Sequence, residues 1–258
     1  LPLGTDRDAT IVFDRSVSPA DLEAMARWRA AGNLLAVDTG KSSFATRDVL
    51  APLGVDFDYG VVFTGAVLID GGYRVLSARY LPDGVARDVA TRTVDLPGVT
   101  TYATTIETDY ILADNNEEIS SILAVFEQLS LEEMDAHRFI GVPLRVTDDA
   151  LRERLYHDLT RRWEGALDCH RNQEFLDVVP AGATKGAGLR ALLDGPLAGQ
   201  DIEVWTIGDS WHDLDMPAAA DYAVALPWSP PEVTAACETT VGSMAEPITT
   251  TPAGDRHE

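Results

Sequence analysis

Two aspartates lie one residue apart near the start of the sequence, in the segment TDRDAT that contains Asp6 and Asp8. Carboxylates at this spacing can bind a hard cation, or one can attack a substrate while the other transfers a proton. The chain contains 42 acidic residues in 258, however, so such a pair indicates nothing by itself. Its meaning depends on which other side chains lie beside it.

Polar residues also follow other apolar runs that are typical of buried strands. The run 33–37 leads into the segment DTGKS, the run 60–63 into TGA, and the run 202–207 into GDSWHD, while a lysine begins a predicted helix after residue 184. Ligands of an open parallel sheet bind outside the carboxyl ends of its strands, so residues far apart in sequence can meet there. We expect one crevice to contain Asp6, Asp8, Thr39, Lys41, Thr64, Gly65, Lys185, Asp209 and Asp213.

This set has the composition of a site for phosphoryl transfer. Carboxylates from two loops suit Mg²⁺, which keeps several waters and accepts one or two carboxylates plus a phosphate oxygen. The cation, Lys185 and the Thr39 hydroxyl would surround a phosphoryl group while one aspartate attacks phosphorus and a second transfers protons. Lys41 and Lys185 are the only lysines among 20 basic residues, which hints that a compact cation is needed at both positions.

The elements that must position these residues are strands that alternate with helices at both ends of the chain. Ser18 and Pro19 are typical of a helix start, Gly32 of its end, and a second helix is predicted over 43–53. Near the C-terminus we predict strands over 175–179, 202–207 and 222–226, with a helix from Lys185 and another that ends near residue 220. This alternation predicts an α/β fold, a Rossmann-like three-layer core with a parallel sheet. The first strand is weak, because residues 1–4 include Pro2, which a central strand disfavours.

A segment of different character lies between the two ends of the chain. Residues 72–171 mix helices such as DDALRERLYHDLTRRW and EEISSILAVFEQL with alternating strands such as HRFIGVPLRV and TDYILA. We predict an inserted α/β domain over 72–171, a core domain formed by 1–71 and 172–242, and a flexible tail over 243–258.

Five segments, in their order and spacing, resemble the motifs of the haloacid dehalogenase (HAD) superfamily, in particular its Cof-type phosphatases with a type C2 cap. They are DRDAT, VDTGKS, TGA, PAGATKGAGLRALL and IGDSWHDLDM. The resemblance extends over about residues 5–226 and implies a HAD-like core, a C2-type cap that selects the substrate, and a Mg²⁺ cofactor. The last motif is the most specific single segment, and the ordered set is more specific than any member.

The resemblance also implies a role for each matching residue. Asp6 would be the nucleophile that forms an aspartyl phosphate, Asp8 the general acid and base, and Thr39 and Lys185 the catalytic residues that bind the phosphoryl group. Mg²⁺ would be held by Asp6, the Asp8 backbone carbonyl and Asp209, with Asp213 as a further ligand or an orienting group. The substrate-binding residues would be Gly40, Lys41, Thr64 and Gly65.

The sequence departs from the family pattern at several motif positions. Ala9 and Thr64 replace the usual Gly and Asn, Lys41 stands for Arg, and His212 replaces an Asn. The segment PWSPP after residue 226 also lacks the usual small residues and Asn. These departures leave three hypotheses open: a phosphatase of a small phosphorylated metabolite such as a sugar or polyol phosphate, a sugar phosphomutase, or a binding or regulatory protein that has lost turnover. The cap residue that contacts substrate also stays open among Arg79, Tyr110, Glu118, His137, Arg138 and Arg145.

The overall composition excludes several classes of partner. A formal charge of −22 disfavours nucleic acid and anionic lipid, which bind mainly through Lys and Arg. No run of about 18 apolar residues is present to span a membrane, and no signal peptide is visible, so we expect a cytoplasmic protein. Cys169 and Cys237 are too few for a disulfide framework or a zinc site. The oligomeric state is not readable from the sequence.

Overall fold

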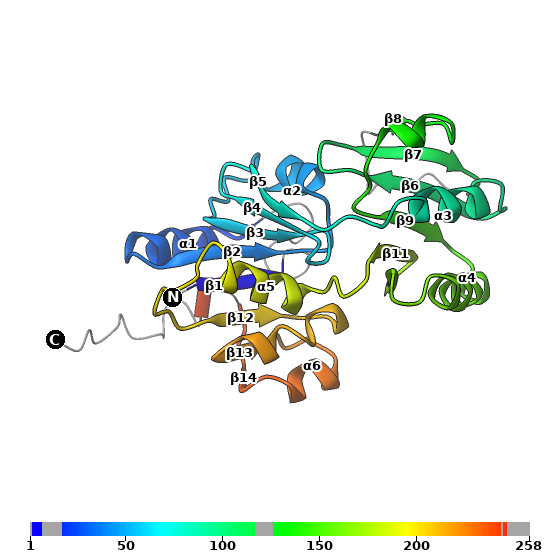
Figure 1. The fold of residues 1–258 in the computed structure, drawn as a ribbon. Helices are drawn as coiled ribbons and strands as arrows, with labels where there is room; N and C mark the ends of the chain where they lie inside the picture. The colour runs from blue at the N-terminus through cyan, green and yellow to red at the C-terminus, as the bar shows by residue number, and fades with distance from the viewer. Residues whose placement is uncertain (1, 7–16, 117–125, 244, 247–258) are drawn as a thin grey trace. The chain divides into compact units, whose positions relative to one another are not determined.

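The structure is a computed structural model that describes residues 2–6, 17–116, 126–243 and 245–246, and of residues 2–6 only the backbone (Figure 1). The chain divides into two compact units. Unit 1 consists of Leu1–Lys41, Thr46–Leu76 and Thr184–Glu258, and unit 2 of Ser42–Ala45 and Ser77–Ala183. The polypeptide thus leaves unit 1 and returns to it, as expected for an inserted domain.

Unit 1 is built on a sheet in which β1 is a central strand (Figure 1). In spatial order, its strands within the described residues are β14 (Thr239–Thr240), β13 (Tyr222–Ala225), β12 (Trp205–Gly208), β1 (Pro2–Asp6), β2 (Leu34–Asp38), β3 (Tyr59–Val62), β4 (Val67–Asp70) and β5 (Val75–Ala78), which ends in unit 2. Every pair from β14 to β3 is parallel, and β4 is antiparallel to β3. The expected weakness of β1 is not seen, because Pro2 is the first residue of the strand, where its missing N–H is tolerated.

Helices cover both faces of this sheet, which confirms the three-layer core. On β2, Ala36 packs in one cluster with Leu192 of α5, whereas its neighbours Leu35 and Val37, which alternate to the opposite face, are also fully buried. Helix α1 packs against the same strand. The described helices of unit 1 are α1 (Pro19–Ala30), α2 (Ser43–Leu50), which begins in unit 2, α5 (Lys185–Asp194) and α6 (Pro231–Ala235), with 3-10 turns η2 (Trp211–Asp213) and η3 (Pro217–Ala219).

One predicted helix of unit 1 is confirmed at its start and another is wrong. Helix α1 begins where predicted, because the Ser18 side chain accepts a hydrogen bond from the Asp21 backbone N–H at 3.1 Å. The single helix predicted to end near residue 220 is wrong, since two short 3-10 turns occupy this region. Pro217 begins the second turn, and a proline cannot continue the hydrogen-bond ladder of a preceding helix.

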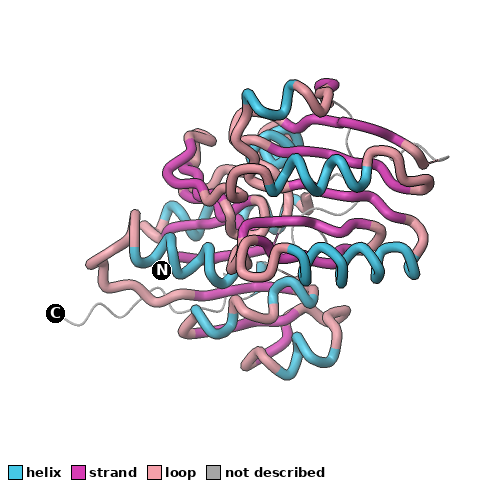
Figure 2. Tube along the Cα trace, turned by 45° about the vertical axis from the view of Figure 1, so that its right-hand side comes forward, coloured by secondary structure: helices cyan, strands magenta, loops and turns pink. Residues whose placement is uncertain are grey.

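Unit 2 is a mostly antiparallel sheet with two helices on one face (Figure 2). The order of its described strands is β10 (Leu167–Asn172), β11 (Phe175–Pro180), β9 (Val142–Val146), β6 (Val99–Thr104), β7 (Asp109–Asp114) and β8 (Glu127–Gln128). Helices α3 (Val85–Thr93) and α4 (Asp149–Arg162) share one apolar core with these strands, and η1 (Glu133–Ala136) is a short turn. The predicted helix DDALRERLYHDLTRRW is confirmed as α4, whose N-cap is Asp148.

The division into units differs from the predicted one at the second crossing. The strand predicted over 175–179 is present as β11, but its assignment to the core sheet is wrong, since β11 pairs antiparallel with β9 and β10 of unit 2. The chain therefore returns to unit 1 at Thr184, not at residue 172. Most of the segment EEISSILAVFEQL and of the tail 243–258 lies outside the described residues. No helix in the described part of the chain is long and apolar enough to cross a membrane.

Candidate active site

The register of the central strands places three chain segments side by side at one edge of the sheet. Asp6, the last residue of β1, lies opposite Asp38, the last residue of β2. On the other side of β1, Thr5 lies opposite Ile207, one residue before β12 ends. The segments that follow β2 and β12 therefore both begin beside the backbone of Asp6. Asp8 and Ala9 lie outside the described residues.

The loop after β2 is held to the loop after β3 by backbone hydrogen bonds. Thr39 is fully buried; its N–H donates to the Val61 carbonyl at 2.9 Å, and its carbonyl accepts from the Thr64 N–H at 3.1 Å. The Thr39 hydroxyl accepts from the Lys41 N–H at 3.2 Å, and the Lys41 carbonyl accepts from Phe63 at 2.7 Å. A side chain on Gly40 would lie 3.5 Å from the Thr64 hydroxyl. Four of the predicted residues, 39–41 and 64, thus form one connected structure.

The turn after β3 contains consecutive residues in the left-handed region. Phe63 and Thr64 each have φ of 51°, and Gly65 has φ of 82°. Asn visits this region more readily than a β-branched residue, so Thr64 holds a strained conformation at a position where the resembled motif has Asn. The Thr64 hydroxyl is buried and has no hydrogen-bond partner in the described part of the chain. A buried hydroxyl in this state is suited to donate to a bound ligand.

Gly65 allows the same turn to touch the start of helix α5. A Cβ atom at this position would lie 1.9 Å from the carbonyl oxygen of Thr184, which is a backbone atom and cannot rotate away. Thr184 is the N-cap of α5, and its hydroxyl accepts from the Ala187 N–H at 3.1 Å. The glycine therefore brings the turn after β3 against the residue that precedes Lys185.

Lys185 is a buried cation at the beginning of α5. A positive charge is unfavourable there, because the helix dipole already places positive charge at this end. The side chain is only 3% exposed, and its Nζ donates to Asp213 Oδ1 at 2.6 Å. Burying a positive charge at a helix N-terminus costs free energy, and the negative charge of Asp213 offsets this cost.

Asp213 has both carboxylate oxygens engaged by protein donors. Oδ1 accepts from Lys185, while Oδ2 accepts from the Asp209 and Ser210 N–H groups at 2.9 and 2.8 Å and from the Ser210 hydroxyl at 3.1 Å. Burial raises the pKa of Asp213, but the charge and hydrogen bond of Lys185, with the backbone donors, outweigh it and hold this pKa below its usual range. Asp213 is therefore an ionised group that orients its neighbours.

Asp209 is a buried carboxylate that directly follows β12, and a tryptophan donates to it. The residue is 8% exposed, and the Trp228 indole Nε1–H donates to its Oδ2 at 3.1 Å. Trp228 lies in the segment PWSPP, which departs from the family pattern and for which the sequence predicted no role. One signal could have found it: Trp228 lies three residues after the end of β13, at the same edge of the sheet as Asp209.

The described residues alone do not complete a metal site. Within them, no three His, Cys, Asp or Glu side chains gather in a way that could hold a metal ion. Asp209 is a hard oxygen donor of the kind that Mg²⁺ accepts, and the backbone of Asp6 ends at the same sheet edge. Carboxylate and carbonyl oxygens of this kind fit Mg²⁺. The carboxylate oxygens of Asp213, in contrast, already accept hydrogen bonds from Lys185, Asp209 and Ser210. His212 lies within turn η2, next to Asp213.

Comparisons with known proteins show one matching family and solved structures of similar fold. The family of haloacid dehalogenase-like hydrolases matches residues 4–247. Similar solved structures include a haloacid dehalogenase-like hydrolase from B. subtilis, with 17% identity and a TM-score of 0.81 over 97% of this chain and 99% of that chain. A protein from Thermotoga maritima has 20% identity and a TM-score of 0.77 (93% and 91% covered), and a sugar phosphatase of HAD subclass IIB has 19% identity and a TM-score of 0.77 (95% and 94%). No curated protein matches.

Proposed function

Because the chain belongs to the haloacid dehalogenase-like hydrolases, we propose that it is a Mg²⁺-dependent phosphatase of a small phosphorylated metabolite, of the sugar or polyol phosphate class. The observation that carries this proposal is the buried ion pair of Lys185 and Asp213, which places a cation at the sheet edge where the motif residues gather. A lysine ammonium group can bind a phosphoryl group as a compact point charge. The sugar phosphatase among the similar structures supports the substrate class.

The proposed reaction has two steps, and the second step regenerates the free enzyme. Asp6 attacks phosphorus and forms an aspartyl phosphate, while the bond to the leaving oxygen breaks and Asp8 donates a proton to that oxygen. Asp8 then takes a proton from a water molecule, which attacks the phosphorus of the intermediate. Free phosphate leaves, and the Asp6 carboxylate is restored. Asp8 lies outside the described residues, so its role rests on the motif resemblance.

The remaining motif residues bind and orient the phosphoryl group. In this proposal, Lys185 offsets its charge, and the hydroxyls of Thr39 and Thr64 donate to its oxygens. The unpartnered Thr64 hydroxyl supports this assignment. The connected backbone around Gly40, Lys41 and Gly65 keeps these donors in place before substrate arrives, which lowers the reorganisation that the reaction needs.

Asp6, Asp209 and the Asp8 carbonyl would hold Mg²⁺, which would neutralise charge on the phosphoryl oxygens. We assign Asp213 to positioning, because Lys185 and three further donors already engage its oxygens. It fixes the direction of the Lys185 ammonium group and the backbone of Asp209. We assign substrate selection to unit 2, which the resemblance identifies with a C2-type cap.

The test is phosphate release from a panel of phosphomonoesters with and without Mg²⁺. We expect Mg²⁺-dependent release of free phosphate and an activity loss of about 1,000-fold or more in Asp6→Asn, because the amide cannot act as the nucleophile. Circular dichroism of the variant controls for folding. Undiminished activity in folded Asp6→Asn would refute the assignment, and an isomerised sugar phosphate without free phosphate would identify a phosphomutase.

A further inference from the structure

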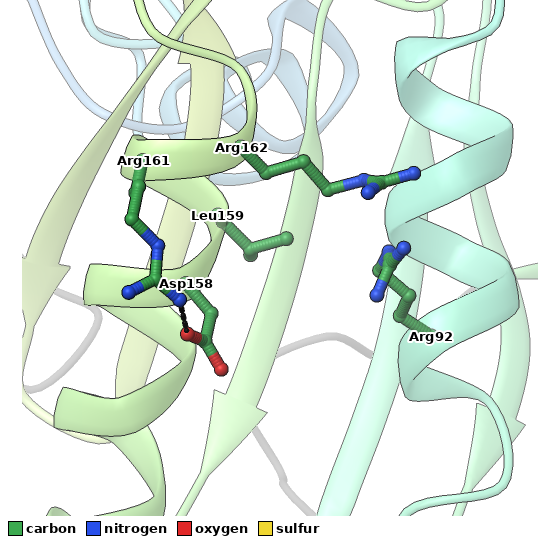
Figure 3. A pocket seen from close by; sticks show the side chains of 5 residues that line it. All are labelled: Arg92, Asp158, Leu159, Arg161 and Arg162. Carbon is green, nitrogen blue, oxygen red and sulfur yellow. Dashed lines mark hydrogen bonds and ion pairs between the residues drawn. The ribbon is translucent and has the colours of Figure 1, made fainter.

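A pocket in unit 2 contains three arginines in a strongly acidic chain. It has a volume of about 450 Å³, within the range of small-molecule sites. The residues that line it, called here the arginine pocket, are Arg92 of α3 and Asp158, Leu159, Arg161 and Arg162 of α4. Figure 3 shows Arg162 extending from α4 across the gap toward α3, where Arg92 lies, and Leu159 pointing from α4 into the same gap. None of these residues belongs to the phosphoryl-transfer motifs.

One carboxylate holds two of the arginines in place. Arg162 donates through Nε and Nη2 to the two oxygens of Asp88 at 2.6 and 2.9 Å, and Arg92 Nε donates to Asp88 at 3.0 Å. The Trp163 indole N–H also donates to Asp88 at 2.9 Å. The Arg162 hydrogen bonds, with those of Trp163 and Arg92, keep the pKa of Asp88 well below its usual range, although burial opposes this. The two guanidinium groups are therefore fixed before any ligand binds.

The fixed guanidinium groups retain donors that the protein does not use. Within the described residues, Nη1 and Nη2 of Arg92 and Nη1 of Arg162 make no hydrogen bond, and the two side chains are 46% and 45% exposed. Arg161 adds a third cation, paired with Asp158 at 2.7 Å. Three arginines against Asp88 and Asp158 leave one net positive charge, whereas the whole chain carries −22. Paired planar guanidiniums match the oxygens of phosphate better than lysines do.

We propose that the arginine pocket binds a phosphate group, either as inorganic phosphate or as part of a small phosphorylated molecule. Arg92 and Arg162 hold the oxyanion through their unused N–H donors, and Arg161 adds charge from the edge of the pocket. Asp158 opposes binding, because it is the carboxylate at this edge and competes for Arg161. This proposal does not depend on the phosphatase reaction, and its test uses no turnover.

The test is an NMR titration of the ¹⁵N-labelled full chain in EDTA at constant ionic strength, because added salt alone screens exposed charges. The reporter is the indole N–H signal of Trp163, which is assigned with Trp163→Phe and which shares Asp88 with both arginines. Inorganic phosphate and glucose 6-phosphate are added in separate titrations. We expect saturable shifts with both probes, and a tighter response to one of them identifies which form the pocket prefers.

Three variants decide whether the arginines carry the binding. Arg161→Gln does not touch Asp88 and is expected to weaken binding about two- to fivefold, the range of exposed charge pairs, while Asp158→Asn is expected to tighten it by a similar factor. Arg154→Gln removes the same charge from an exposed site on α4 that does not line the pocket, and should leave binding unchanged. No saturable shift with either probe, or equal weakening in Arg154→Gln and Arg161→Gln, would overturn the proposal.

Discussion

The buried ion pair of Lys185 and Asp213 makes the sharpest prediction for stability. The two side chains are 3% and 2% exposed and lie 2.6 Å apart. Removing one member of such a pair leaves a buried charge without compensation, which costs about 3–5 kcal/mol. We therefore expect the free energy of unfolding to fall by this amount in Lys185→Met and in Asp213→Asn. Because the double variant removes both charges of this pair, it should lose at least about 2 kcal/mol less than the sum of the two.

A matched control is present in the same unit. Arg27 and Glu23 of α1 also lie 2.6 Å apart, but their side chains are 54% and 69% exposed. The same exchange, Arg27→Met with Glu23→Gln, should give a coupling of only about 0.3–0.5 kcal/mol, because water already solvates both charges. Urea unfolding followed by tryptophan fluorescence measures both cycles, since four of the five tryptophans belong to unit 1. A coupling at the buried pair no larger than that of the control would refute the reasoning.

The pH dependence of the same variants provides a second check. The folded state lowers the pKa of Asp213, so the unfolded state takes up its proton first as the pH falls. The stabilisation is therefore complete well above pH of about 4, the ordinary carboxyl pKa, and is lost as the pH falls through the lower folded value. The unfolding free energies of the wild type and Asp213→Asn should converge in acid and differ fully at pH 7. A difference that stays constant from pH 7 to pH 3 would contradict this account.

Three further changes test other contacts. Gly65→Ala places a Cβ atom 1.9 Å from a backbone oxygen at a φ of 82°, so thermal unfolding should show a loss of about 2 kcal/mol or more. Trp228→Phe removes the donor to Asp209 and should weaken Mg²⁺ binding about tenfold in a calorimetric titration, with unchanged circular dichroism; an unchanged affinity would exclude this role. Burial raises the pKa of Asp109, although hydrogen bonds from Ser42 and Thr104 oppose it, so its contribution to stability is complete below pH of about 4 and declines as the pH rises toward the folded value. Asp109→Asn cannot ionise, and its melting temperature should decline less over that range than that of the wild type.

The sequence was most informative where a continuous apolar run ends in polar residues. The run 33–37 became β2 and the second half of the run 202–207 became part of β12, which begins only at Trp205. Strands buried on both faces of a parallel sheet need apolar side chains throughout. The run 175–179 has the same composition but belongs to the other sheet, where it pairs with Leu144 and His170 among others. Composition indicates burial, whereas the choice of sheet depends on pairing partners in β9 that lie 30 or more residues away in the sequence. The sequence of β11 alone therefore does not predict which sheet it joins.

The candidate site shows the same limit at the level of single side chains. The residue types and the order of the motifs predicted which loops meet, and the contacts of Thr39 with Thr64 and of Lys185 with Asp213 agree with that order. The sequence left Asp213 open between a metal ligand and an orienting group. Its four hydrogen bonds favour the second role, and only coordinates could reveal that its oxygens are already engaged.

Asp213 also explains why the two charged ends of the site depend on each other. Through Oδ1 it neutralises Lys185, and through Oδ2 it holds the backbone of Asp209. Gly208 is required for this arrangement, because a Cβ atom there would lie 2.6 Å from that of Asp213. A substitution at position 213 would therefore disturb Lys185 and Asp209 together, the proposed phosphate-binding cation and the proposed metal-binding carboxylate. The spacing of Asp209 and Asp213 in the GDSWHD segment thus sets the geometry of Lys185 and of Asp209. The two aspartates therefore cannot exchange their functions, although they are chemically identical.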